Sequence, residues 1–328
     1  MRFWGQSDGN QSTENKTSAG ESQPRRLRAR VGLALGAGAA RGWAHIGVIH
    51  RLEEAGIPID IIGGTSIGAL VGGCYVAGRI DALEEFARKL TRRRIFSLLD
   101  FSWRGGGLIS GDRLQKMLQA ELGETRIEEL NRPFVCIGTE LMTGHEIWLQ
   151  RGLLSEAIRA SYALPGVFKP IFTANQWIID GAVVNPIPVS ACRALGARMV
   201  IAVNVNADAF GGTVVQQPDV LSAIEAYGRD GTDSSGMPPP VLPRHTRTAP
   251  PGISAVLVAA FNITQDRLAR SRLAGDPPDV LISPRTADVG LFDFDKADVA
   301  IEAGREAAER ALPEIQWALE RLEHVIDE

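Results

Sequence analysis

The chain has 328 residues, of which 45% are hydrophobic and 23% charged, and its formal net charge is −4. This composition is typical of a globular protein, and it lacks the basic excess that a nucleic-acid-binding face requires. The three widely spaced cysteines, Cys74, Cys136 and Cys192, form neither a disulfide framework nor a zinc signature. We therefore expect buried thiols in a reducing compartment.

Residues 1–29 are polar and cannot bury a core, which predicts a disordered tail that ends in a cluster of arginines. Two interpretations of the cluster stay open: a solvated tail, or attraction to anionic lipid headgroups. The sequence shows no apolar run of signal-peptide length and none that approaches the ~20 residues of a membrane span. We therefore expect a cytoplasmic protein, either soluble or peripheral to the inner face of the membrane.

The part of the chain that is predicted to be ordered starts at Val31. Val31–Leu35 is expected to be a short apolar strand, and a turn of glycine and alanine follows it. Residues 42–55 then repeat apolar side chains at helical spacing. A second strand is expected at 59–63 and a second helix at 67–77. Strand and helix alternate, and this alternation implies parallel strands.

The rest of the chain continues this pattern. Further helices are expected at 81–94, at 110–122 with Ser110 as N-cap, and at 155–162, 253–273 and 294–325. Further strands are expected at 133–139, 146–149, 177–179, 199–205 and 280–282. Residues 207–252 are rich in turn-forming residues and predict a flexible insertion. The domain would thus span 30–328, with this insertion and a C-terminal helical part at 253–328.

The segment Gly64-Thr-Ser-Ile-Gly68 fits G-x-S-x-G, the nucleophile elbow. Such a serine stands on a tight turn between a strand and a helix, and the flanking Gly64 and Gly68 allow close approach of neighbouring backbone. The helix N-terminus also brings positive partial charge to the hydroxyl of Ser66. The alternative is an ordinary strand-to-helix turn with Ser66 as the helix N-cap.

Small residues also fill the first strand-to-helix turn, Gly36–Gly42. A dinucleotide fingerprint is disfavoured because Arg41 stands where its last glycine belongs, and a P-loop is disfavoured because the lysine is missing. A third interpretation is a set of exposed N–H groups that binds a developing oxyanion. Arg41 would then add charge or orient the loop. The alternative is a close-packed turn with Arg41 in solvent.

An elbow serine needs a base, and the histidines are poorly placed to supply one. The chain has five histidines: His45, His50, His145, His245 and His324. None of them lies in an obvious loop at the end of a strand and after a candidate acid. Asp180-Gly181 ends an apolar strand, and Gly181 permits tight backbone beside the carboxylate. Asp180 is therefore the candidate base for Ser66. The alternative is an Asx turn or a helix cap.

These motifs, in this order, resemble the patatin-like phospholipase family, in particular its bacterial single-domain branch. Leu33–Val48 is similar to the glycine-rich opening of the family, Gly64–Gly68 to its elbow, and Asp180–Ala182 to its D-G-A/G motif. Secondary matches are Thr139–Gly144, Pro165–Pro170 and Asn185–Pro188. The resemblance runs from about Val31 to Val205 and faintly further.

The resemblance implies an α/β/α sandwich with a mainly parallel sheet and a Ser–Asp dyad without histidine. Ser66 would attack an ester carbonyl, Asp180 would take its proton, and the amides around Ala37, Gly38 and Ala39 would hold the oxyanion. The expected substrates are phospholipids, lysophospholipids and neutral lipids, with no metal or other cofactor. The family loop is often all glycine, so Ala37 and Ala39 are a departure, because alanine disfavours positive φ.

Access for an acyl chain suggests two lid candidates: the apolar segment Ile95–Trp103 before a glycine run, and the insertion at 207–252. Core packing and a disordered linker are the respective alternatives. The favoured function is a lipid acyl hydrolase. An acyltransferase that uses the same acyl-enzyme stays open, as does a non-catalytic acyl-binding regulator; the oligomeric state is not predicted.

Overall fold

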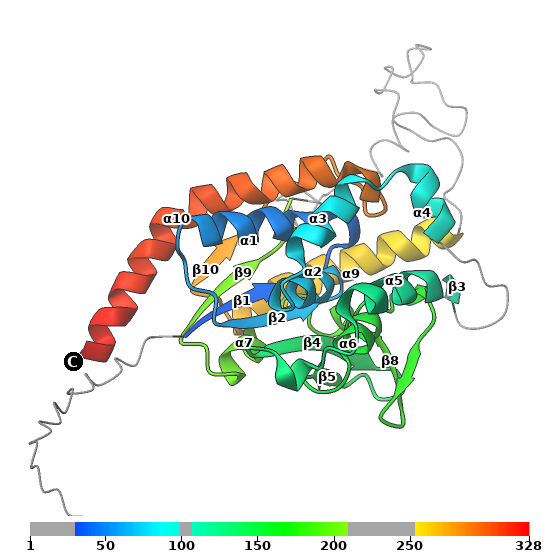
Figure 1. The fold of residues 1–328 in the computed structure, drawn as a ribbon, viewed down its shortest axis with the longest axis horizontal. Coiled ribbons are helices and arrows are strands. Elements are labelled where there is room, and N and C mark those ends of the chain that lie inside the picture. The colour runs from blue at the N-terminus through cyan, green and yellow to red at the C-terminus, as the bar shows by residue number, and fades with distance from the viewer. Residues whose placement is uncertain (1–29, 99–106, 110, 209–252, 328) are drawn as a thin grey trace, which may run out of the picture.

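A computed structural model of the chain describes residues 30–98, 107–109, 111–208 and 253–327 (Figure 1). The predicted tail at 1–29 and residues 209–252 of the predicted insertion lie outside the described residues. The division into tail, domain and insertion therefore stays a prediction.

The described part is built on a mixed eight-stranded sheet, in the order β10-β9-β1-β2-β4-β8-β7, with β5 also paired to β4. The strands β10, β9, β1, β2 and β4 are mutually parallel, whereas β5, β7 and β8 run antiparallel to their neighbours. The bounds are β1 Val31–Leu35, β2 Ile61–Thr65, β4 Phe134–Glu140, β5 Glu146–Leu149, β7 Ile171–Thr173, β8 Gln176–Asp180, β9 Met199–Val203 and β10 Val280–Ile282. A separate parallel pair joins β3 (Gly107–Ile109) to β6 (Gly166–Phe168).

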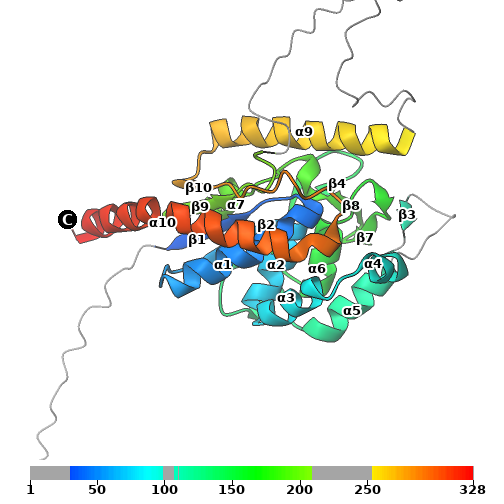
Figure 2. The ribbon, with the colours of Figure 1, turned by 90° about the horizontal axis from the view of Figure 1, so that it is seen from above.

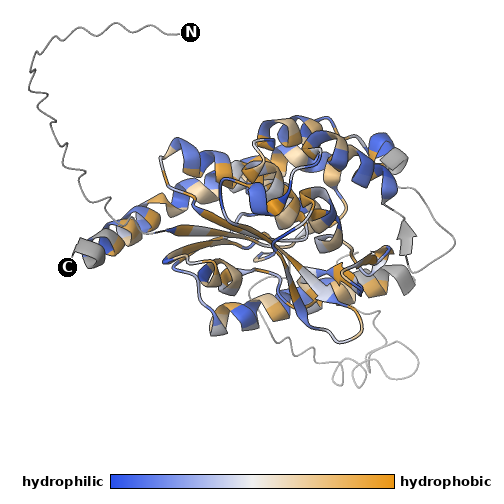
Figure 3. Ribbon diagram, turned by 60° about the horizontal axis from the view of Figure 1, so that its bottom comes forward, coloured by the Kyte–Doolittle hydropathy of each residue, from blue (hydrophilic) through white to orange (hydrophobic). Residues whose placement is uncertain are grey.

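Helices cover both faces of the sheet, so the expected α/β/α sandwich is confirmed (Figure 3). One face carries α1 Ala44–Glu54, α2 Ile67–Val76, α3 Ile80–Arg88, α5 Asp112–Leu122, α6 Leu154–Ser161 and α10 Ala297–Asp327. The other face carries α7 Val189–Ala194 and α9 Ile253–Gly275. The strand β1 is buried along its whole length, as a central parallel strand between two helical layers must be.

Several sequence-based boundaries are wrong. The helix expected at 81–94 is two helices, α3 and α4 (Arg92–Leu98), separated by Lys89–Thr91. Helix α5 has Gly111 as its N-cap, with φ of 74°, so the predicted cap at Ser110, which lies outside the described residues, is misplaced. The second strand runs two residues later than expected and ends at Thr65. This shift places Ser66 directly after the strand.

Strand β4 has two different neighbours along one of its edges. Parallel β2 pairs with the first half, where Thr65 lies opposite Ile137. Antiparallel β8 pairs with the second half, where Asp180 lies opposite Gly138. The strand β5 pairs with residues 136–139 and so occupies the other edge. Since β2 and β8 share one edge, they meet end to end, and Thr65 and Asp180 lie opposite consecutive residues of β4.

The C-terminal helix α10 packs along α1 through two glycines. A Cβ on Gly47 of α1 would lie 1.9 Å from the carbonyl oxygen of Ile301, and a Cβ on Gly304 of α10 would lie 1.9 Å from that of Ala44. Both helices therefore approach backbone to backbone, which only glycine allows. This contact holds α10 over the helix that follows the glycine-rich turn.

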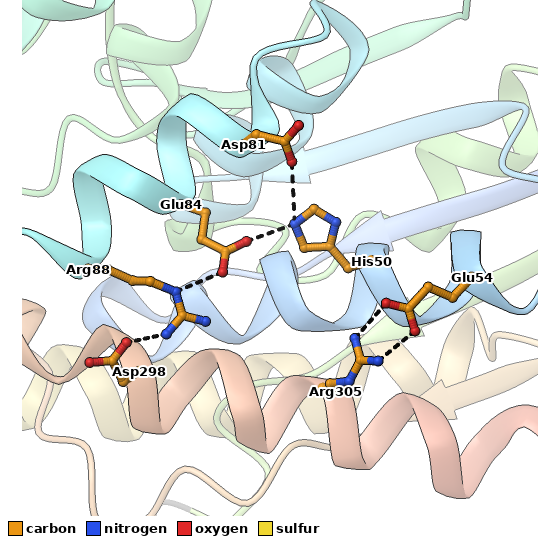
Figure 4. Close-up of polar contacts among 7 residues, drawn as sticks. All are labelled: His50, Glu54, Asp81, Glu84, Arg88, Asp298 and Arg305. Atoms are coloured by element: carbon orange, nitrogen blue, oxygen red, sulfur yellow. Dashed lines mark hydrogen bonds and ion pairs between the residues drawn. The ribbon is translucent and has the colours of Figure 1, made fainter.

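Charged side chains surround the contact between α1 and α10 (Figure 4). Arg305 of α10 donates hydrogen bonds of 2.7 and 2.6 Å to the Glu54 carboxylate of α1. Of the other pairs drawn there, His50 with Asp81 and Glu84 joins α1 to α3, and Arg88 with Asp298 joins α3 to α10. Arg88 also pairs with Glu84 within α3. Exposed ion pairs contribute only about 0–1 kcal/mol each, so the glycine contact and the apolar core dominate the packing of α10.

We predict that Gly304→Ala destabilises the protein by roughly 2 kcal/mol or more, because the added methyl group forces the two helix backbones apart. The matched control is Gly275→Ala at the end of α9, where an added Cβ meets nothing within 4 Å. Urea unfolding curves of the two variants and the wild type measure the effect. Equal midpoints for Gly304→Ala and Gly275→Ala would contradict the close contact.

Candidate active site

Ser66 stands on a strained turn between β2 and α2. Its φ of 57° and ψ of −119° lie outside the conformations that serine favours. A Cβ on Gly64 would lie 2.5 Å from the Gly68 carbonyl oxygen, and a Cβ on Gly68 would lie 2.2 Å from that of Leu35. Both glycines are therefore required by close backbone contacts, as a nucleophile elbow demands.

The hydroxyl of Ser66 donates a 2.6 Å hydrogen bond to Oδ2 of Asp180. The other carboxylate oxygen, Oδ1, accepts from the Ala182 amide at 2.8 Å. Gly181, between them, cannot carry a side chain, because its Cβ would lie 2.2 Å from the Ile137 carbonyl oxygen. The meeting of β2 and β8 on β4 thus brings together the two residues that the sequence singles out.

Burial dominates the protonation of Asp180, whose side chain is almost fully removed from solvent. Desolvation raises the pKa of Asp180 to about 7, against the smaller lowering effects of the hydrogen bonds from Ser66 and Ala182. A carboxyl group with a pKa near neutrality is able both to accept and to return a proton. Burial of Asp180 therefore makes the stability of the folded protein depend on pH. The stabilisation from the neutral carboxyl is complete below pH 3.8, the ordinary pKa of Asp, and is lost as the pH rises through about 7.

Hydroxyl groups hold the backbone on either side of the pair. Ser161 Oγ accepts from the Ser66 amide at 3.0 Å and donates to the Ile137 carbonyl at 2.6 Å. Thr139 donates to the Asp180 carbonyl at 2.9 Å. Thr139 begins the family-like segment Thr139–Gly144, but nothing in the sequence indicates the hydrogen-bonding role of either residue, since buried serine and threonine leave no pattern that separates such contacts from ordinary packing.

The glycine-rich turn lies beside the elbow and offers two free amides. Among the described residues, the N–H groups of Gly38 and Ala39 have no hydrogen-bond partner, whereas that of Ala37 donates to the Pro186 carbonyl at 2.9 Å. Ala37 is therefore not available as an oxyanion donor in this conformation. Ala39 has φ of 47°, so the conformation that alanine disfavours is present. A Cβ on Gly38 would lie 2.2 Å from a methyl carbon of Val205, so this position needs glycine.

Arg41 fixes the turn from outside. Its guanidinium donates to the Val289 carbonyl at 2.9 Å and to Asn206 Oδ1 at 3.0 Å. Asn206 in turn donates to the Ala37 carbonyl at 2.9 Å. These contacts favour the orienting role over direct charge for Arg41. Asn206 has no sequence signal of its own, because it lies beside the predicted insertion.

One histidine lies near this turn, but its ring is fully buried. His45 donates from Nε2 to the Gly36 carbonyl at 2.8 Å, and burial lowers the pKa of its imidazole to about 4. A neutral His45 therefore stiffens the turn and does not contact Ser66 or Asp180. His50 and His145 bind carboxylate and hydroxyl partners elsewhere, His324 lies on α10, and His245 lies outside the described residues.

The described ranges contain no group of three or more His, Cys, Asp or Glu side chains arranged to hold a metal ion. The three cysteines are buried and unpaired, as expected. The lid candidate at Ile95–Trp103 lies largely outside the described residues, as does the one at 207–252.

A model of the family described as patatin-like phospholipase matches residues 33–193. An uncharacterized NTE family protein of Mycobacterium bovis is 33% identical in an alignment that is 328 residues long and covers 86% of this chain and 91% of that protein. Lysophospholipase nte1 of Neurospora crassa is 29% identical over 298 residues, which cover 87% of this chain and 18% of that protein.

The crystal structure of VipD from Legionella pneumophila shares the fold. It superimposes with a TM-score of 0.50 and 13% identity, over 87% of this chain and 67% of VipD. The mixed sheet between two helical layers, the match of the family model and the full-length NTE relative agree with one another. The chain belongs to the patatin-like phospholipase family, a family of lipid ester hydrolases.

Proposed function

We propose that this lipid ester hydrolase cleaves carboxylic esters of lysophospholipids, phospholipids or related lipids through Ser66 and Asp180. The observation that carries the proposal is the 2.6 Å hydrogen bond from the Ser66 hydroxyl to a buried carboxylate. A lysophospholipase is among the relatives that match the chain over most of its length, which supports this substrate class.

In the proposed first step, Ser66 Oγ attacks the ester carbonyl carbon while its proton passes to Asp180 Oδ2. The oxyanion accepts hydrogen bonds from the free amides of Gly38 and Ala39. The tetrahedral intermediate then collapses, the carbon–oxygen bond to the leaving alcohol breaks, and Asp180 returns the proton to that alcohol. The product is an acyl-enzyme on Ser66.

In the second step, water attacks the carbonyl carbon of the acyl-enzyme, and Asp180 takes a proton from this water. The second tetrahedral intermediate breaks to release the fatty acid, and Ser66 recovers its proton. Attack by an alcohol in place of water would transfer the acyl group. No feature of the described residues favours such an acceptor, and the intact Ser66–Asp180 pair disfavours a purely acyl-binding regulator.

We propose that a lipid surface contacts this protein at the edge of the sheet where Ser66 lies. Because β8 pairs with Gly138–Glu140, the β7–β8 hairpin projects beyond the end of β2 (Figure 1). The rings of Phe172 and Trp177 contact each other across this hairpin in a tilted arrangement, with centroids 4.9 Å apart, and the two residues are 56% and 45% exposed. Residues 164–179 contain no acidic side chain, which suits contact with phospholipid headgroups. None of the described helices is long and apolar enough to cross a bilayer.

The dyad is tested with a chain-length series of p-nitrophenyl esters. We expect Ser66→Ala and Asp180→Asn each to lower kcat at least ~100-fold, because one removes the nucleophile and the other its proton acceptor. Thermal unfolding of each variant checks that the fold is retained. Folded variants with wild-type turnover would remove the basis of the proposed function.

The surface contact is tested with Trp177→Ala and the matched control Trp317→Ala, an exposed tryptophan on α10. Trp177→Ala should lower hydrolysis of phospholipid in vesicles roughly tenfold and leave hydrolysis of soluble p-nitrophenyl acetate unchanged, because only the vesicle reaction needs interfacial contact. Equal losses of vesicle activity in the two variants would argue against a role for the hairpin.

A further inference from the structure

Side chains of α2, α3 and α5 line an apolar groove. These three helices are labelled in Figure 2. Its cavity volume is about 200 Å³, which is below the roughly 300–1,000 Å³ of pockets for drug-sized ligands. A space of this size suits one hydrocarbon chain. Its walls come from three helices: Leu70 and Cys74 of α2, Leu83 and Phe86 of α3, and Leu114 and Leu118 of α5.

The α2 side of the groove leads away from the nucleophile. Ser66 directly precedes α2, and Leu70 and Cys74 lie four residues apart on one face of that helix. Four residues of helix span about 6 Å along the axis, so Leu70 lies about one turn and Cys74 about two turns into α2. The near end of the groove is therefore about one helical turn along the chain from Ser66.

The two charged residues of the groove both lie at its far end. The Arg79 amide donates to the Cys74 carbonyl at 2.7 Å, directly after α2 ends. After burial, the Glu121 carboxylate is the second cause of the raised pKa of Cys74, about 12, so Glu121 also lies close to Cys74. The charged lining residues are thus at the end of the groove that is farther from Ser66.

The lining residues of the opposite end are apolar, and the Arg94 guanidinium lies 5.5 Å from the centre of the Phe86 ring. Phe86 stands seven residues after Arg79 on α3, and Leu114 stands seven residues before Glu121 on α5. Seven residues of helix span about 10 Å, so both side chains lie at the end nearer Leu70. Among the lining residues, the charged ones therefore lie away from the nucleophile and apolar ones lie toward it.

We propose that this groove binds the acyl chain of the substrate, with the ester at Ser66 and the chain lying along α2 toward Cys74. The inference rests on the proposed function and adds its substrate specificity: the enzyme would prefer esters with a single long chain that enters the groove. Continuity with Ser66 along α2 is the reason for choosing an acyl chain as the occupant over a partner helix.

Filling the groove tests this assignment. Ala82 and Ala120 lie at its rim, so Ala82→Phe and Ala120→Phe should shorten it without touching Ser66 or Asp180. Each pair of methylene groups that is excluded should lower kcat/KM for long-chain p-nitrophenyl esters roughly tenfold. Turnover of p-nitrophenyl acetate should stay unchanged. The matched control is Ala274→Phe, at an exposed position of α9 on the other face of the sheet.

A second variant changes the groove in the opposite direction. Phe86→Ala should widen its near end and raise the activity toward bulkier, branched acyl chains relative to acetate. Chain-length profiles of the three groove variants, Ala82→Phe, Ala120→Phe and Phe86→Ala, that all match the wild type would overturn the groove assignment while leaving the dyad intact. A wild type that hydrolyses no ester, acetate included, would overturn the proposed function and the groove with it.

Discussion

The structure depends on one register: two strands of opposite direction share a single edge of β4. Parallel β2 ends opposite Ile137 and antiparallel β8 ends opposite Gly138. Ser66 directly follows β2, and Asp180 is the last residue of β8. Because the two strands meet there, these two residues come within hydrogen-bond distance. Neither residue depends on a long loop for its position, which is how a site is held within the small tolerances that catalysis requires.

Close backbone packing around this junction has two costs. Ser66 and Ala39 occupy left-handed backbone conformations, and Asp180 is buried with a raised pKa. Strain and desolvation of this kind persist only where the surroundings over-determine them. Here the glycine contacts of the elbow, the hydroxyls of Ser161 and Thr139, and the Arg41–Asn206 bridge supply that support.

Much of this was predictable from the sequence, because alternating strands and helices and the G-x-S-x-G and Asp-Gly motifs are local patterns. The patterns predicted parallel strands and made Asp180 the candidate base for Ser66, and the resemblance to the patatin-like phospholipase family implied the α/β/α sandwich and the pairing of the two residues. The sequence could not predict that the amides of Gly38 and Ala39 are free while the amide of Ala37 is hydrogen-bonded. This difference depends on which carbonyls lie nearby after folding. The three-residue strands β3, β6 and β7 were missed, whereas β10, of the same length, was predicted from its uninterrupted apolar run. The break between α3 and α4 has no glycine or proline to mark it.

The central claim is that Asp180 activates Ser66 directly. Labelling with a fluorophosphonate, followed by mass spectrometry of the peptides, tests it most directly. The account predicts modification at Ser66, with a rate that rises as the pH increases through about 7 because only the ionised Asp180 accepts the proton. It also predicts that Asp180→Asn reacts at least ~100-fold more slowly at every pH. Labelling of Asp180→Asn at the wild-type rate, or modification of a serine other than Ser66, would contradict the account.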